Sequence, residues 1–430
     1  MRTWLREEIL RRVLRNAGLL GAGKAAGAIL HLAGLALTAR MLGPVAFGLL
    51  IVLRSYAQAA SGLARFQSWQ TLIRFGAVRA HEGDRAGFRD LAAFTVALDA
   101  ATGLVAALAA ILLAPMFGLW FGVTPESIRL AQLYCVVIPL MASATPTGIL
   151  RIFDRFDLLS RQNVVTPAVR LAGIGVAALL GAPLWAMVTA WLVSDLVGDL
   201  YLWRQAWGEL KRRKLVGGAM PSPLRAVSQN RNIIGFSLAA NGVATLNQAA
   251  TPLFTLLVGA LLGPAAAGLY RVAQVVLEAA AAPGELAMRS LFPELARLLE
   301  RDRRHFWRLV GRALILSAGL GLILALIVEA AGPFLLIVCV GADYAGAVPV
   351  LRIVALSIPP SLAVFPLETA LLAMGLAGRL LLVRALAALV AFATAAWLAQ
   401  QLGLSGIGIA VTFGASAALV GMLLLLVRRQ

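Results

Sequence analysis

The sequence predicts an all-α integral membrane protein with twelve transmembrane helices in two six-helix bundles, related by a pseudo-twofold axis along the membrane normal. Three observations lead to this prediction. Of the 430 residues, 60% are hydrophobic and only 13% are charged, whereas soluble domains carry about 25% charged residues. Apolar stretches recur along the whole chain, and most approach or exceed the roughly 20 residues that cross a bilayer. The third observation is an internal repeat.

The apolar stretches form two sets of six. Ala, Leu, Val and Gly dominate them, as expected of helices that pack closely in lipid. The first six predicted spans cover residues 17–38, 45–72, 91–114, 128–150, 164–180 and 184–203. The second six cover residues 233–261, 265–292, 309–331, 347–374, 380–398 and 406–427. An even number of spans places both termini on one side of the membrane.

Loop charge predicts which side that is. The N-terminal segment and the even-numbered loops are rich in arginine, whereas odd-numbered loops such as QQLGLSG at 400–406 are nearly free of basic residues. Only Arg40 and Arg129 fall at the outer ends of helices. Because Lys and Arg concentrate in cytoplasmic loops, we expect cytoplasmic N- and C-termini. The same distribution accounts for the net charge of +18, so we predict no nucleic-acid partner.

The internal repeat divides the chain near its middle. LGPVAFGL at residues 42–49 recurs as LGPAAAGL at 262–269, an offset of 220 residues. In both places Gly and Pro suit a tight turn between the first two helices of a half. We therefore expect an N-terminal lobe at 1–203, a basic cytoplasmic linker at 204–232 and a C-terminal lobe at 233–430. Six spans per half insert both lobes in the same orientation.

Charged residues inside the spans mark candidate sites, because each is costly in lipid and should face a cavity or a partner. Arg271 is equivalent by the offset to Ile51, which lies one turn before Arg54 on the same helix face. We expect Arg54 and Arg271 to face each other and, with Lys24, to bind an anionic headgroup, since guanidinium groups pair with phosphate. The alternative is that each arginine neutralises a nearby carboxylate such as Glu278.

The remaining intramembrane charges have other predicted roles. Asp195, Asp199 and Arg170 are expected to be structural partners between helices. Asp99, Glu278 and Glu368 are candidates for ion coupling, and Glu285 shares the helix face of Arg271 and Glu278 at seven-residue spacing.

No cofactor, metal or catalytic group is predicted. GLLGAGK at 18–24 fits most of a phosphate-binding loop, but Ala25 stands where the Mg²⁺-binding Ser or Thr would be. We interpret Gly23 and Gly27 instead as a close-packing helix face. No metal-ligand spacing or nucleophile–base set is evident, and Cys135 and Cys339 are expected to be unpaired.

Two motifs carry a resemblance to a known family. They are ARMLGP at 39–44 with Phe47-Gly48, and RIFDRFD at 151–157 with TPAVR at 166–170. With the twelve-span plan, nearly the whole chain resembles the polysaccharide transporters of the multidrug/oligosaccharidyl-lipid/polysaccharide exporter superfamily, which include the O-antigen (Wzx-type) flippases. The resemblance implies two bundles around a V-shaped cavity. It also implies alternating access that moves a polyprenyl-pyrophosphate-linked oligosaccharide across the bacterial inner membrane. The implied partners are this lipid-linked oligosaccharide, membrane lipid and polysaccharide-assembly proteins.

Three alternatives stay open. The first is a multidrug/cation antiporter of the same superfamily; some of these carry an acidic residue in helix one, where this chain has Lys24 and His31. The second is a membrane glycan polymerase or ligase. Such enzymes tend to need an extended outer loop, and the longest predicted outer loops here are short, at about 115–127 and 332–346. The third is a non-transporting scaffold.

Overall fold

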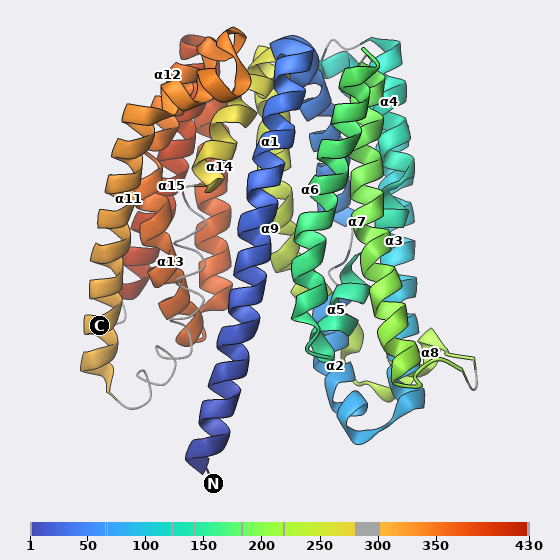
Figure 1. Ribbon diagram of the computed structural model, residues 1–430. Helices are drawn as coiled ribbons and strands as arrows, with labels where there is room; N and C mark the ends of the chain where they lie inside the picture. Colours follow the sequence, from blue (N-terminus) through green and yellow to red (C-terminus); the bar gives the residue numbers. More distant parts are fainter. Residues whose placement is uncertain are drawn as a thin grey trace. The chain divides into compact units, whose positions relative to one another are not determined.

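Helix is found in each of the twelve predicted spans, within the residues that the structure describes. The computed structural model describes residues 2–64, 66, 68–121, 124–141, 143–181, 184–217, 220–279 and 302–427, and every regular element in these ranges is a helix (Figure 1). Among the described residues, six helices are long and apolar enough to cross a membrane, or up to seven if a bent pair counts as one span. One of the six, at residues 18–63, covers nearly all of the first predicted span and residues 45–63 of the second. The protein is thus an all-α, multi-pass membrane protein.

The chain forms two compact units. Unit 1 comprises residues 1–38 and 53–252, and unit 2 comprises residues 39–52 and 253–430. The helices of the first half and the following segment are α1 (Arg2–Ala64), α2 (Ser68–Glu82), α3 (Arg85–Phe121), α4 (Pro125–Val136), η1 (Ile138–Met141), α5 (Ala144–Ile152), α6 (Phe156–Leu179), α7 (Leu184–Arg212), α8 (Pro223–Gln229) and α9 (Ile233–Leu262). Helix then covers residues 264–279, followed by α11 (Arg303–Val340), η2 (Ala342–Ala347), α12 (Val348–Ala355), α13 (Ile358–Ala373), α14 (Ala377–Leu402) and α15 (Leu404–Val427).

The two copies of the repeat have the same backbone break. Gly43 has φ of 69° and Gly263 has φ of 87°, in the left-handed region that favours glycine. In each copy a proline follows and begins the next helical stretch, where its missing N–H is not needed. The predicted turn is confirmed at both positions, and at the first one it is a kink with non-helical backbone that separates two helices within α1.

The repeat copies also touch each other at equivalent residues within unit 2. A Cβ on Gly48 would lie 1.9 Å from the carbonyl oxygen of Pro264, and a Cβ on Gly268 would lie 2.9 Å from the Cα of Gly48. Gly268 is Gly48 shifted by the repeat offset. Contact between equivalent positions is the pattern that a twofold relation between the two segments produces.

Close packing of glycines also joins α1 to α6 in unit 1. A Cβ on Gly23 would lie 2.2 Å from Ser160 Oγ, and one on Gly27 would lie 2.1 Å from the Asn163 carbonyl oxygen. Ser160 Oγ in turn donates to the carbonyl oxygen of Leu19, at 2.6 Å. Gly23 and Gly27 are therefore a helix-packing face, as predicted.

Unit 1 has an apolar core at the end where α2, α3, α5 and α7 come together. Its fully buried members include Leu72, Phe88 and Leu150, and α6 runs beside α7 (Figure 1). The segment predicted as a linker, 204–232, contributes to this core: α7 continues to Arg212, and Leu215 and Ala226 are buried. The boundaries of the two compact units therefore differ from the lobe boundaries inferred from the repeat. The repeat-based boundaries stay a prediction.

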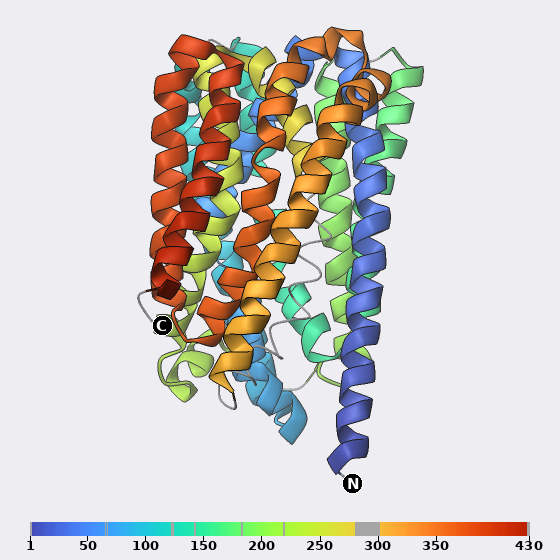
Figure 2. The same ribbon diagram turned by 90° about the vertical axis from the view of Figure 1, so that its left-hand side faces the viewer.

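Unit 2 is organised around α11, α13, α14 and α15. Phe306, Leu367 and Met422 are buried in its core. The α14–α15 pair is an antiparallel hairpin that turns at Gly403, whose φ is 57°; it has the reddest colours of Figure 2.

Candidate functional site

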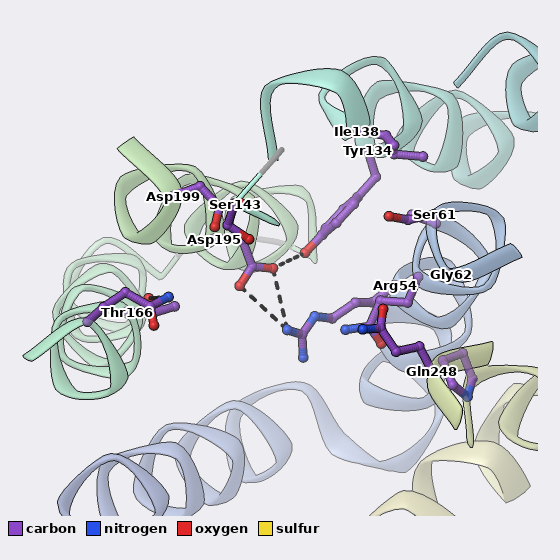
Figure 3. A pocket seen from close by; sticks show the side chains of 14 residues that line it. Arg54, Ser61, Gly62, Tyr134, Ile138, Ser143, Thr166, Asp195, Asp199 and Gln248 are labelled. Atoms are coloured by element: carbon purple, nitrogen blue, oxygen red, sulfur yellow. Dashed lines mark hydrogen bonds and ion pairs between the residues drawn. The ribbon is translucent and has the colours of Figure 1, made fainter. Parts of the chain in front are cut away.

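A polar cavity of about 360 Å³ lies within unit 1 (Figure 3). Its walls come from α1, α4, α6, α7 and α9, together with residues near η1. Most lining side chains carry a charge, an amide or a hydroxyl. The lining residues are Arg54, Ala57, Gln58, Ser61, Gly62, Tyr134, Ile138, Ser143, Gln162, Thr166, Asp195, Asp199, Gln248 and Pro252. Polar side chains concentrated inside a membrane bundle mark a functional site by default.

Asp195 of α7 is the centre of the charged network in this cavity. Its carboxylate accepts hydrogen bonds from Arg170 Nη2 at 2.5 Å and from the Tyr134 hydroxyl at 2.9 Å. Arg54 Nη2 lies farther away, at 3.4 Å and 3.5 Å from the two carboxylate oxygens. Figure 3 shows the Arg54 guanidinium and the Tyr134 hydroxyl both pointing toward Asp195. One carboxylate therefore serves two guanidinium groups.

Trp191, one turn before Asp195 on α7, supports both arginines. The guanidinium carbons of Arg54 and Arg170 lie 4.8 Å and 4.5 Å from the centre of its ring. Arg170 also donates to Ser194 Oγ at 3.0 Å and lies 3.2 Å from Nδ1 of His31. The indole is fully buried and its Nε1 donates to Thr38. Contact with an aromatic face stabilises a cation that is withdrawn from water.

Arg54 is the less firmly held of the two cations. Its contacts with Asp195 are long for charge-assisted hydrogen bonds, which are normally about 2.7–2.9 Å. Its Nε is buried and has no hydrogen-bond partner in the described part of the chain. Arg170, by contrast, is 96% buried and uses Nε, Nη1 and Nη2 within the network. An anionic ligand would therefore engage Arg54 before Arg170.

The other predicted binding residues lie elsewhere. Lys24 is on the exposed side of α1 and does not line the cavity. Arg271 belongs to unit 2, where its guanidinium bonds to Glu278 at 2.9 Å and to Gln274 at 3.1 Å. This matches the alternative considered above, in which each arginine neutralises a nearby carboxylate; here the carboxylate is that of Glu278, seven residues later on the same helix face. The pairing of Arg54 with Arg271 stays a prediction.

The three ion-coupling candidates have three different environments. Asp99 is buried on α3, where it accepts from Ser68 Oγ at 2.8 Å and from Thr145 Oγ1 at 2.7 Å. Glu278 is exposed and paired with Arg271, and Glu368 is paired with Arg384. Glu285 lies outside the described residues. Within the described ranges, no three His, Cys, Asp or Glu side chains gather as a metal site.

Sequence reasoning did not single out the neutral lining of the cavity. Gln58 follows Arg54 by four residues, Thr166 follows Gln162 by four and Asp199 follows Asp195 by four. Four-residue spacing places each pair on one helix face. Polar pairs at this spacing, inside an apolar span or across its end, were the available signal. Tyr134 had no such signal, because its partner is on another helix.

Comparison with known proteins gives the family. The model of the family described as polysaccharide biosynthesis protein matches residues 13–299, more than half of the chain. The chain is 34% identical over 341 residues to the inner membrane protein YghQ of Escherichia coli (strain K12), covering 79% of this chain and 96% of that protein.

Solved structures give the same fold. An inward-facing multidrug resistance MATE family transporter of the MOP superfamily aligns with a TM-score of 0.68 at 16% identity, covering 95% of this chain and 94% of that one. A mutant of the Vibrio cholerae MATE transporter VcmN aligns with a TM-score of 0.64 at 18% identity, covering 99% and 98%. A MOP superfamily transporter from Pyrococcus furiosus, described as having a binding pocket of reverse polarity, aligns at 0.61 and 17% identity, covering 96% and 97%. The chain therefore belongs to the polysaccharide biosynthesis protein family and has the fold of the MOP-superfamily transporters.

Proposed function

We propose that this protein is a flippase that moves a polyprenyl-pyrophosphate-linked oligosaccharide across the bacterial inner membrane for surface polysaccharide biosynthesis, by alternating access. The family match to polysaccharide biosynthesis proteins and the inner-membrane relative support this substrate class and this location. The arginine-rich loops on one side support cytoplasmic N- and C-termini. Polysaccharide-assembly proteins are the expected partners.

The observation that carries the proposal is the chemistry of the cavity in unit 1. Its amide and hydroxyl side chains, among them Gln58, Gln162 and Thr166, offer both donors and acceptors. This mixture matches the hydroxyl groups of a glycan better than it matches an apolar drug, for which a predominantly apolar pocket is the norm. Arg54 adds a guanidinium that a pyrophosphate oxygen can engage.

The balance of charges supports release as well as binding. Asp195 already neutralises Arg170 closely and Arg54 loosely. An incoming phosphate would take Arg54 without leaving Asp195 unpaired, because Arg170 and Tyr134 remain on that carboxylate. When the phosphate leaves, Asp195 is again available to Arg54. A transport site needs this reversibility, since a cation without any alternative partner would hold the anion too tightly to release it.

The test is transport of a radiolabelled lipid-linked oligosaccharide into sealed vesicles, comparing the wild type with Arg54→Ala, Arg271→Ala and Lys24→Ala. We expect Arg54→Ala to lose most of its transport, and Arg271→Ala to do so if that residue contributes from the second half. The matched control is Arg204→Ala, an exposed arginine on the cytoplasmic extension of α7. Full transport by all three variants would refute the role of these cations.

The ion-coupling residues are a separate proposal. Asp99 has the strongest case, because it is almost completely buried and accepts hydrogen bonds from the hydroxyls of Ser68 and Thr145. Asp99→Asn, Glu278→Gln and Glu368→Gln would each be assayed for transport driven by a proton or sodium gradient. A coupling residue keeps substrate binding and loses the gradient dependence; unchanged gradient dependence in all three variants would remove them from consideration.

A multidrug/cation antiporter is the second candidate, because the similar solved structures include MATE transporters. Efflux of cationic dyes in cells that lack any glycan gene cluster would favour it. The two functions separate cleanly, since an antiporter should lower dye accumulation without any lipid-linked sugar present. Detectable glycan polymerisation by the purified protein would instead favour an enzyme.

A further inference from the structure

Unit 1 contains a second cavity, of about 410 Å³, that the proposed transport site does not use. It lies between the N-terminal part of α3, the C-terminal part of α7, Ile149 of α5, and residues 215–217 and 221 before α8. Every lining side chain except that of Arg89 is apolar. They include Phe88, Ala93, Trp203 and Trp207. An apolar cavity with a single cation differs in kind from the amide- and hydroxyl-lined cavity around Arg54.

The cavity lies where the hydrocarbon core of the membrane meets the headgroups. Arg85 and Arg89 precede the long apolar run of α3, and Trp203 and Trp207 precede Lys211 at the end of α7. Tryptophans and basic residues at helix ends are characteristic of the membrane–water interface. The distribution of basic residues among the loops places this end on the cytoplasmic side. The cavity therefore lies at the level of the inner leaflet.

The chain is anchored to α3 directly after Pro221, which lines the cavity together with Leu215, Val216 and Gly217. The backbone N–H of Ser222 donates to Asp90 Oδ1 at 2.7 Å, and Arg225 pairs with the same carboxylate at 3.6 Å. Asp90 is the neighbour of Arg89 on α3, against which α8 packs (Figure 1). Leu215 is buried. The chain that begins α8 is thus anchored to α3 beside the cavity.

The guanidinium of Arg89 has N–H groups that can donate hydrogen bonds to a ligand at the edge of this cavity. Its Nε bonds to the carbonyl oxygen of Arg85 at 3.3 Å. Within the described residues Arg89 has no carboxylate partner, whereas its neighbours Arg79 and Arg225 are both paired with carboxylates. A guanidinium beside an apolar cavity at headgroup level complements a molecule with a phosphate next to a hydrocarbon chain.

We propose that this cavity binds one acyl chain of an anionic phospholipid of the inner leaflet, with the phosphate held by Arg89. The lining has no amide or hydroxyl side chain for a glycan, so the occupant is a membrane lipid rather than the transported sugar-lipid. The bound lipid fills the space between α3 and α7 and joins them through its chain. This site is independent of the proposed transport function.

The binding test uses the purified full-length protein, stripped of lipid in detergent and examined by native mass spectrometry. Dioleoyl phosphatidylglycerol and dioleoyl phosphatidylcholine have the same chains and differ in charge. We expect tighter binding of the phosphatidylglycerol, and about tenfold weaker binding in Arg89→Gln, the loss expected for one charge-assisted hydrogen bond. Arg204→Gln, which removes the same charge from an exposed position outside the cavity, should bind as the wild type does.

A second variant tests the cavity itself. Ala93→Trp fills it and should abolish retention of the lipid, whereas Ala100→Trp, on an exposed position of α3 outside the lining, should not. Circular dichroism and gel filtration would confirm that each variant is folded. Equal binding of the two lipids, or equal loss in Arg89→Gln and Arg204→Gln, would overturn the proposal. Displacement of phosphatidylglycerol by undecaprenyl phosphate at equimolar concentration would overturn the assigned occupant.

Discussion

Asp195 is the residue whose removal should disturb unit 1 most, because two guanidinium groups and a tyrosine hydroxyl converge on it. In Asp195→Asn the side chain keeps its shape and loses its charge, and Arg54 and Arg170 then share Trp191 with no anion between them. At a separation of about 4 Å and an effective dielectric constant of about 20, each ion pair is worth about 4 kcal/mol of Coulomb attraction. The arginines stay buried and do not regain their hydration, so removing one partner of a buried ion pair lowers the free energy of unfolding by about 3–5 kcal/mol.

The two arginines should not contribute equally to this loss. Arg170 bonds to Asp195 at 2.5 Å and is almost fully buried, whereas Arg54 lies at 3.4 Å and is 16% exposed. In a double-mutant cycle we therefore expect a larger coupling energy for Asp195 with Arg170 than with Arg54, within the range of about 0.5–3 kcal/mol measured for neighbouring residues. Arg170→Met combined with Asp195→Asn should be less destabilised than the sum of the single variants, because Arg170→Met removes the charge that Asp195→Asn leaves buried at Arg170, and only Arg54 then lacks its carboxylate.

Reversible unfolding of the purified protein in mixed micelles, followed by intrinsic tryptophan fluorescence, measures these free energies. Asp84→Asn is the matched control, since Asp84 forms an exposed ion pair with Arg79 and should change stability by less than about 1 kcal/mol. An Asp195→Asn variant that loses no more stability than Asp84→Asn, or simple additivity of Asp195→Asn and Arg170→Met, would contradict the convergence of charges on Asp195.

Three further predictions concern other contacts. Gly48→Leu and Gly268→Leu should each destabilise unit 2 strongly, because a Cβ at either position overlaps backbone atoms. The control Gly319→Leu, at an open position on α11, should leave the unfolding midpoint nearly unchanged. Equal effects of the three substitutions would contradict the packing described. The hydrogen bond from Arg155 lowers the pKa of Asp157 below its usual 3.8, so the stability from this pair is fully present above pH 3.8 and is lost as the pH falls through the lowered pKa. The difference in unfolding midpoint between the wild type and Asp157→Asn should therefore shrink as the pH falls over that interval. A difference that grows on acidification would contradict this prediction. Gln58→Leu should weaken binding of a water-soluble analogue of the lipid-linked sugar about fivefold to tenfold, measured by isothermal titration calorimetry, because about one hydrogen bond is lost. The control is Gln132→Leu, at a glutamine outside the cavity lining, which should bind the analogue as the wild type does.

The fold was largely predictable because its determinants are local in the sequence. The length of an apolar run, the charge of the next loop and the Gly-Pro turn can each be recognised within a few residues. The matching positive φ at Gly43 and Gly263 is an example, since the repeated string required a glycine at both places. Span 45–72 was less well described, because α1 ends at Ala64 and α2 begins only at Ser68.

The site was predictable only in part, because it depends on contacts between distant residues. Arg54 stood out as a charge inside an apolar span, and Arg170 and Asp195 were expected to pair between helices, as they do. That the same carboxylate also meets Arg54 and Tyr134 required the fold, since these side chains come from three helices separated by more than 50 residues along the chain. The repeat offset related Arg54 to Arg271 by position, but side-chain partners depend on local sequence: Glu278 lies seven residues after Arg271 and pairs with it.

The central claim is that the cavity around Arg54 carries the headgroup of a lipid-linked oligosaccharide. The most direct measurement is the initial rate at which proteoliposomes move a fluorescent polyprenyl-pyrophosphate oligosaccharide between leaflets, with the wild type, Arg54→Gln and Arg204→Gln reconstituted at equal density. The account predicts transport by the wild type and by Arg204→Gln, and a rate at least about tenfold lower for Arg54→Gln, as expected from losing a charge-assisted contact with the phosphate. No transport by the wild type, or equal rates for Arg54→Gln and Arg204→Gln, would contradict it.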